Sequence, residues 1–220
     1  MAAAAPEPGM LARGPWAPGD VVARWREDEY AAPPERTAAA DAAIRALHDR
    51  GSPSHDGLGA RLANHRVQDG RLVLELQPVR WALRLVDEDA SQSLSALCVT
   101  RDSEGRWLAG RRAPWLSSWP GRWALGAGGA VDPGESPAHT LVRELDEEWG
   151  VVPERVQGEA LVRLPHQMIL FVGQAWLPAG AEVTRDAEHD EHAWWPADVA
   201  AWPAEADAVL RRMAQLLVGL

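Results

Sequence analysis

A helix with two well-marked ends lies in the second half of the chain and constrains the structure around it. Ser136 can cap the amino end, because its hydroxyl can accept a hydrogen bond from a free backbone N–H. Pro137 then takes the first helical position, where its missing N–H costs nothing. Gly150 follows the last turn, where a left-handed residue commonly ends a helix. The apolar stripe of this helix consists of Ala138, Leu141, Val142 and Leu145. The sequence therefore predicts a helix from about residue 137 to residue 149.

Three glutamates lie on one side of this predicted helix. Glu144, Glu147 and Glu148 are spaced i, i+3 and i+4, so their carboxylates cluster. Like charges near a helix carboxyl end repel each other and oppose the helix dipole. A solvated acidic face with an Arg143–Glu147 ion pair is the ordinary explanation of such a helix. A bound divalent cation is the other, because Mg²⁺ and Mn²⁺ prefer carboxylate and carbonyl oxygens.

The residues around the helix favour the metal. Residues 129–151 follow the pattern Gly-x5-Glu-x7-Arg-Glu-Leu-x-Glu-Glu-x-Gly-Val. The defined positions are Gly129, Glu135, Arg143, Glu144, Leu145, Glu147, Glu148, Gly150 and Val151. This segment resembles the Nudix box of the Nudix hydrolase family. The resemblance implies an α/β/α sandwich with a mixed sheet, in which the box forms a loop, a helix and a loop.

The resemblance also implies roles for individual residues. Glu144, Glu147 and Glu148 look like the metal ligands, with the Gly129 carbonyl as a further oxygen ligand for Mg²⁺ or Mn²⁺. Arg143 would orient the glutamates, and Glu135 would support it. An acidic residue outside the box often completes such a site, and Glu188 is the first choice for it, ahead of Glu191. The general base is Glu144, Glu148 or Glu188; the pattern does not choose between them.

The activity implied is hydrolysis of a nucleoside diphosphate linked to another moiety. Nucleoside-diphosphate sugars and ADP-ribose rank above simple nucleotides, because a long N-terminal extension could supply walls for a second moiety. A (d)NTP pyrophosphohydrolase and a non-catalytic nucleotide sensor are the alternatives. A pure binder has no need of three metal-binding glutamates, which argues against the sensor. An isopentenyl diphosphate isomerase would share the fold but needs a catalytic cysteine, and Cys98 lacks that context.

Basic and aromatic side chains precede the box. Arg111 and Arg112 end a predicted strand and could contact phosphate, although a strand end on the surface explains them as well. Trp115 could stack on a base or a sugar, although core packing explains a tryptophan more often. We take these three as candidate substrate-binding residues.

The chain divides into three parts by pattern. Residues 1–18 are rich in Ala and Pro and predict a mobile tail, residues 19–90 a small α+β extension, and residues 91–220 the Nudix domain. The predicted helices cover residues 21–25, 37–49, 137–149 and 204–217. The predicted strands include a hairpin of 58–67 and 71–79 around Asp69-Gly70, then 94–100, 106–112, 123–125, 160–164 and 168–176.

The amino-acid composition indicates which binding partners, which cell compartment and which oligomeric state to expect. The net charge of −10 argues against non-specific nucleic-acid binding through phosphates. No apolar run is long enough for a membrane span, and the first residues do not form a secretory signal. The single cysteine, Cys98, suits a reducing cytoplasm. Twelve tryptophans against one Phe and one Tyr predict more aromatic surface than one core absorbs, and hence a homodimer.

Overall fold

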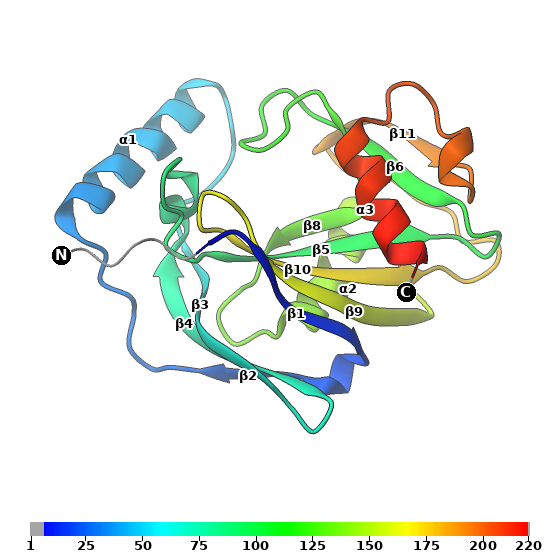
Figure 1. Cartoon of the computed structure of the whole chain (residues 1–220). Helices are drawn as coiled ribbons and strands as arrows, with labels where there is room; N and C mark the ends of the chain where they lie inside the picture. Colours follow the sequence, from blue (N-terminus) through cyan, green and yellow to red (C-terminus); the bar gives the residue numbers. More distant parts are fainter. Residues whose placement is uncertain (1–6, 220) are drawn as a thin grey trace.

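The protein is built on one large mixed β-sheet, described here for residues 7–219 of a computed structural model (Figure 1). The main path through the sheet is β1-β9-β10-β5-β6-β11, with β8 paired to β5 and β7 paired to β6. Only β10 and β5 run parallel; every other pair in this sheet is antiparallel. The strands are β1 (Gly9–Trp16), β5 (Leu94–Arg101), β6 (Trp107–Arg112), β7 (Trp123–Leu125), β8 (Ala127–Ala130), β9 (Arg155–Arg163), β10 (Ile169–Trp176) and β11 (His189–Trp195).

Two helices cover opposite faces of this sheet. Alternate residues of β5 point to opposite faces, as the pleat requires. Cys98 belongs to the core under α2 (Pro137–Trp149), whereas Val99 belongs to the core under α3 (Ala208–Val218). Figure 1 shows α3 in front of the sheet and α2 behind it. The predicted α/β/α sandwich with a mixed sheet is confirmed.

The large sheet opens between β5 and β6. These strands pair only at Arg101 and Trp107, and from there they diverge. The gap between them is filled by β8 against β5 and by β7 against β6. Gly126 joins the two short strands with a φ of +64°, and a side chain there would collide with the Cys98 carbonyl. The widened end of the gap brings the carboxyl end of β6 and the glycines of β8 to one opening.

The extension forms a second, three-stranded sheet. Its order is β2-β4-β3, with β2 parallel and β3 antiparallel to β4. The elements are β2 (Val21–Trp25), α1 (Pro34–Asp49), β3 (Leu58–Gln68) and β4 (Arg71–Arg80), followed by the short helix η2 (Trp81–Leu85). Asp69 and Gly70 both have positive φ, as a two-residue hairpin turn demands, so the predicted hairpin is confirmed.

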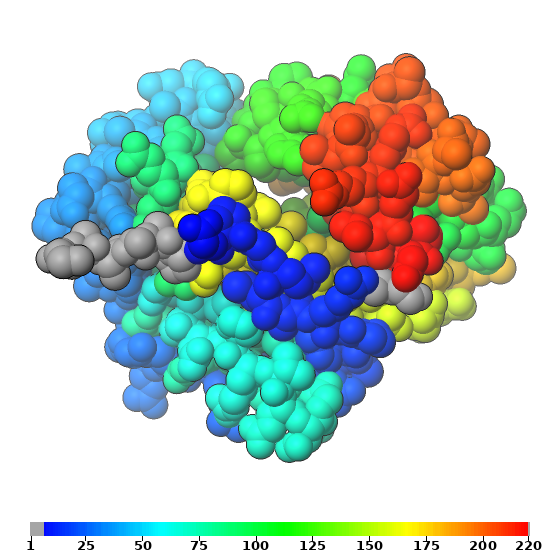
Figure 2. All heavy atoms as spheres, viewed as in Figure 1, coloured from blue at the N-terminus to red at the C-terminus, as the bar shows by residue number. Residues whose placement is uncertain are grey.

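Two predictions for the N-terminus are wrong. Residues 9–16 do not form a mobile tail; they form β1, which pairs with β9 and buries Trp16. Residues 1–6 of that expected tail lie outside the described part. The short helix expected after Asp20 is the strand β2, because Val21 and Val22 suit a pleated surface and pair with β4. Figure 2 shows β1 in dark blue between the cyan β3–β4 hairpin and the red α3.

The extension and the large sheet share a continuous core. Leu62, Leu72 and Leu74 of the small sheet belong to the same buried cluster as Leu94 and Leu141. The part of the chain from residue 19 to 90 therefore packs as a wall of the larger unit rather than as a separate globule.

Of the twelve tryptophans, five are buried, six are half-buried and one is exposed. Trp16, Trp107, Trp149, Trp195 and Trp202 are buried, and of all twelve only Trp119 is exposed. The homodimer expected from the composition stays a prediction. No helix within residues 7–219 is long and apolar enough to cross a membrane.

Candidate active site

The helix α2 has the ends that the sequence predicts. The Ser136 hydroxyl accepts a hydrogen bond from the His139 backbone N at 3.4 Å. Gly150 closes the helix in the left-handed conformation, with a φ of +64°. Leu141, Leu145 and Trp149 anchor the helix in the core, which leaves its glutamates toward the sheet opening.

Arg143 organises the carboxylates of the box. Its guanidinium donates to Glu135 at 3.0 and 3.2 Å, to Glu144 at 2.8 Å and to Glu147 at 3.0 Å. It also donates to the Ala130 carbonyl at 3.0 Å, which ties α2 to β8. One cation thus holds three carboxylates in place, and the pKa of Arg143 is raised by these partners, against the opposing effect of its burial. This arrangement is compatible with the orienting role expected of Arg143, which stays a prediction.

Glu144 lies against the glycines of β8. A side chain at Gly129 would collide with the Glu144 carboxylate, which explains why the pattern has glycine there. Burial raises the pKa of Glu144 to about 7, although the Arg143 charge acts in the opposite direction. A carboxylate in this state can take up a proton near neutral pH.

Glu148 is the most buried carboxylate of the box, with 3% of its surface exposed. One oxygen accepts a hydrogen bond from the Gly128 backbone N at 2.9 Å. The other oxygen is buried, has no hydrogen-bond partner in residues 7–219, and lies 3.7 Å from the equally unpartnered Nε2 of His189. Burial raises the pKa of Glu148 well above its ordinary value. Buried oxygens of this kind commonly mark a ligand or an ion that completes them.

A cavity of about 460 Å³ gathers these groups with residues distant in the sequence. Its wall includes Gly129, Glu144, Glu147 and Glu188, while Glu148 lies directly behind the glycines. Glu188 enters from the segment before β11, where its carbonyl accepts from the Ala113 backbone N at 2.8 Å. Burial raises the pKa of Glu188 as well, and the nearby Arg112 charge opposes that rise.

The candidate substrate-binding residues separate into two groups. Arg112 and Trp115 line the cavity. Arg111 does not, because it points to the opposite face of β6 and pairs with Glu191 of β11 at 3.4 Å. Successive residues of a strand face opposite sides, so only one of the two adjacent arginines can reach the site. The same ion pair also removes Glu191 from the candidates for the acidic residue outside the box.

Residues of the extension form the other side of the cavity, where the sequence predicts walls, although no local signal singled out the individual residues. His55, Leu58, Trp81 and Arg84 all contribute to the wall. Arg84 donates to the Ser95 hydroxyl at 2.8 Å, which fixes its guanidinium beside β5. No motif surrounds these residues; their role depends on the packing of η2 against the large sheet.

The donor set suits a hard divalent cation, although it is not preassembled. Within residues 7–219, no three His, Cys, Asp or Glu side chains stand in a ready arrangement for a metal ion. Arg143 already donates hydrogen bonds to one oxygen each of Glu144 and Glu147. A cation could contact the unpartnered oxygen of Glu148. It could also contact the carboxylate of Glu147, whose side chain is exposed. Carboxylate oxygens of this kind fit Mg²⁺ or Mn²⁺.

Cys98 cannot serve as a nucleophile in this arrangement. It is fully buried in β5, and burial raises its pKa to about 12. A thiol that remains protonated at neutral pH is unreactive.

We compared the chain with protein-family models, curated proteins and solved structures. The family model described as the NUDIX domain matches residues 92–217. An isopentenyl-diphosphate Δ-isomerase of Corynebacterium diphtheriae is 34% identical over 65 residues, which cover 30% of this chain and 36% of the isomerase. A CMP-5'-(N-acetyl-N-hydroxy-3-aminopropyl)phosphonate hydrolase of Streptomyces rubellomurinus is 34% identical over 114 residues, which cover 49% of this chain and 53% of that hydrolase.

The chain thus spans about a third and about half of the length of these two curated relatives. Among solved structures, the MutT protein of Methanosarcina mazei is similar, with 26% identity, a TM-score of 0.45, and coverage of 58% of this chain and 93% of that protein. The family match covers more than half of the chain and includes the whole box helix and the cavity residues of the large sheet, although not those of the extension. The chain belongs to the Nudix family.

Proposed function

We propose that the protein is a metal-dependent hydrolase that cleaves the diphosphate linkage of a nucleoside diphosphate joined to another moiety. One observation carries this proposal: Glu144, Glu147 and Glu188 face a single cavity of about 460 Å³, with Glu148 behind its glycine floor. Such a volume is within the range of small-molecule sites. Burial raises the pKa values of Glu144, Glu148 and Glu188, and buried carboxylates of this kind are costly for the fold and typical of catalytic sites.

The metal ligands in this proposal are Glu144, Glu147, Glu148 and the Gly129 carbonyl, for Mg²⁺ or Mn²⁺. When bound, the cation would neutralise the diphosphate and make a water molecule more acidic. Arg143 holds Glu144 and Glu147 in position and keeps their charges compensated until a cation binds. Gly128 orients Glu148 through its backbone N–H.

Glu188 is our choice for the general base. Its carboxylate faces the cavity and is not engaged by Arg143, unlike that of Glu144. Its raised pKa brings it nearer to the range in which a base works best at neutral pH. Glu188→Gln should reduce turnover and remove the acidic limb of the pH–rate profile. If that limb persists in Glu188→Gln, the base is Glu144 or Glu148.

Substrates with a second moiety are favoured over simple nucleotides. His55, Leu58 and Trp81 extend the cavity beyond the carboxylates, so a sugar or ribose beyond the diphosphate would have walls to contact. Binding energy from such a remote part can position the phosphorus for attack. The Streptomyces relative, which is named as a hydrolase of a CMP-linked phosphonate, is consistent with this ranking.

A substrate panel tests the ranking. Nucleoside-diphosphate sugars and ADP-ribose should be cleaved with higher kcat/KM than (d)NTPs, with nucleoside monophosphate as the measured product. A plain dNTP that exceeds every diphosphate-linked sugar would favour the pyrophosphohydrolase alternative. Saturable nucleotide binding without any turnover would favour a sensor.

The isomerase alternative rests on a short match and lacks its nucleophile. Cys98 is buried and has a pKa of about 12. Cys98→Ala should therefore retain hydrolase activity. A loss of activity in that variant, with the fold intact, would reopen the isomerase assignment.

We also propose a cytoplasmic homodimer. The support for a dimer comes from α3, whose outer side exposes Val209 and Leu216 at a spacing of two helical turns. Light scattering at micromolar concentration should give a dimer mass, and Leu216→Glu should reduce it to the monomer mass. A monomer mass for the wild-type protein would refute the dimer. The cytoplasmic assignment rests on the single reduced cysteine.

A further inference from the structure

Arg84 is a half-buried cation at the boundary between the extension and the large sheet. It lies in η2, before the segment matched by the family model. Its guanidinium donates to the Ser95 hydroxyl at 2.8 Å and lies 5.3 Å from the centre of the Trp81 ring. Burial lowers the pKa of Arg84 to about 10, so the side chain remains charged at neutral pH.

Arg112, at the end of β6, is a second arginine beside this boundary, and its hydrogen bonds lie at the surface. It donates to the Ser118 carbonyl at 3.0 Å and more weakly to the Ser118 hydroxyl at 3.5 Å. Within the described residues, neither Arg84 nor Arg112 forms an ion pair with a carboxylate, whereas Arg143 has several such partners. The charges of Glu144 and Glu188 act on Arg84 across the cavity without a direct contact, so each guanidinium can still accept an anion as a direct partner.

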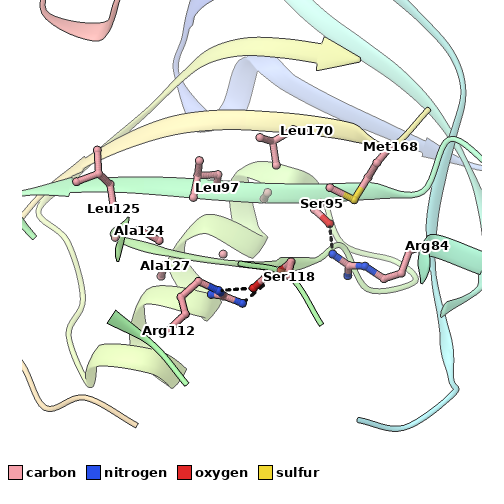
Figure 3. Close-up of a pocket in the computed structure, with 14 residues that line it drawn as sticks. Arg84, Ser95, Leu97, Arg112, Ser118, Ala124, Leu125, Ala127, Met168 and Leu170 are labelled. Carbon is pink, nitrogen blue, oxygen red and sulfur yellow. Dashed lines mark hydrogen bonds between the residues drawn. The ribbon is translucent and has the colours of Figure 1, made fainter. Parts of the chain in front are cut away.

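The two arginines border the same space. Both line the large cavity that contains Glu144 and Glu188, and both line an adjoining pocket of about 140 Å³. Figure 3 shows their guanidinium groups entering this pocket from opposite ends. The Arg112 charge acts against the Arg84 charge, whereas the Glu144 charge has the larger effect and favours it. An anion between the two arginines would contact two guanidinium groups that have no direct carboxylate partner among the described residues.

We propose that Arg84 and Arg112 together bind a phosphoryl group of the substrate, so that the N-terminal extension supplies one half of the phosphate site. The proposal rests on the proposed function, because that function identifies the substrate as a diphosphate. A phosphoryl group has several acceptor oxygens, which suits two forked guanidinium donors. The carboxylates on the other side of the cavity would repel an anion, so the phosphate belongs on the arginine side.

Arg101 provides a matched control. It too is a partly buried arginine, 4.4 Å from the centre of a tryptophan ring, and it donates only to a backbone carbonyl. It lies at the far end of β5 from Ser95 and is not part of either cavity wall. Arg101→Gln therefore removes a similar side chain without touching the proposed site.

The test is calorimetric titration of inorganic pyrophosphate into the full chain, freed of divalent ions on a chelating resin, at fixed ionic strength. We expect the Kd of Arg84→Gln to rise at least about tenfold, as for loss of a hydrogen bond between charged groups. Arg84→Lys should recover part of the affinity, and Arg101→Gln should bind as the wild type does. The unliganded Arg84→Gln and Arg101→Gln should unfold at similar temperatures, because each loses hydrogen bonding to a neutral acceptor and one contact with a tryptophan ring.

Three results would overturn the proposal: no saturable binding by the wild type, equal affinity of Arg84→Gln and Arg101→Gln, or binding of inorganic phosphate as tight as that of pyrophosphate. The last would indicate a site for free phosphate rather than for a diphosphate. Pyrophosphate binding requires no turnover, so it is independent of the proposed hydrolysis. An Arg84-dependent affinity in a protein that cleaves no substrate would support the anion site and refute the hydrolase.

Discussion

The carboxylate of Glu148 accepts a hydrogen bond from the backbone N–H of Gly128 at 2.9 Å, while its second oxygen remains buried and without a partner in residues 7–219. This contact joins the box helix to the strand that carries the glycine floor of the cavity. Half of the carboxylate is thus fixed by the fold, and the other half is available to a ligand.

Replacement of Glu148 by Gln should separate catalysis from folding. The amide retains the shape of the side chain but removes its charge, so we expect turnover to fall at least ~100-fold. Thermal unfolding should occur at the same or a higher temperature, because a buried and poorly solvated charge is lost. Asp146→Asn is the control, since Asp146 is exposed on the same helix. Near-wild-type turnover in Glu148→Gln would contradict the assignment.

Glu144 should make the metal-free protein less stable as the pH rises. Its pKa is about 7 in the folded state and near 4.5 when unfolded, so the folded state holds the proton more tightly. The contribution of Glu144 to the free energy of unfolding is therefore full below about pH 4.5 and is lost as the pH rises to about 7. The loss is on the order of 1–3 kcal/mol.

Urea unfolding at several pH values, with divalent ions removed, measures this effect. Glu144→Gln should show a shallower decline between pH 5 and 7 than the wild type (roughly the window that the linkage relation gives). Identical pH profiles for the two proteins would show that Glu144 has an ordinary pKa.

The ends of α2 and the β3–β4 hairpin could be predicted because their signals are local. Ser136, Pro137 and Gly150 each act on their own backbone, and Asp69-Gly70 defines its own turn. The carboxylate cluster could be predicted for the same reason, since helical spacing alone places Glu144, Glu147 and Glu148 together.

The features that could not be predicted from the sequence depend on contacts between segments that are distant in the chain. Trp16 is buried only because β1 pairs with β9, more than a hundred residues later, and no local pattern announces that pairing. Arg84 reaches the cavity only because η2 packs beside β5. Which of Arg111 and Arg112 faces the cavity depends on the strand register. Because the two adjacent residues are identical, the sequence alone does not show which one points inward.

Arg143 should contribute to stability as well as to activity. Arg143→Ala leaves Glu135 and Glu144 without their main partner, so we expect a loss of about 1–3 kcal/mol in the free energy of unfolding. Arg143→Lys should recover only part, because an ammonium cannot bridge three carboxylates as a guanidinium does. Arg106→Ala is the control, since its ion pairs with Asp102 and Glu104 lie on the surface. Equal stability of Arg143→Ala and the control would mean that the network is not structurally important.

Leu58 should affect large substrates more than small ones. It is exposed at the start of β3 and forms part of the cavity wall. Leu58→Ala should raise KM for a nucleoside-diphosphate sugar about three- to tenfold, the scale of a lost apolar contact. KM for a dNTP should change less. Val67→Ala, at the other end of the same strand, should change neither. Parallel changes for both substrates in Leu58→Ala would exclude a role of the extension in substrate choice.

The most direct test of the central claim is hydrolysis of ADP-ribose and of a nucleoside-diphosphate sugar before and after metal removal. Nucleoside monophosphate release should vanish in excess chelator and return on addition of Mg²⁺ or Mn²⁺, because the clustered carboxylates need a cation to approach a diphosphate. Undiminished turnover in excess chelator would contradict the account.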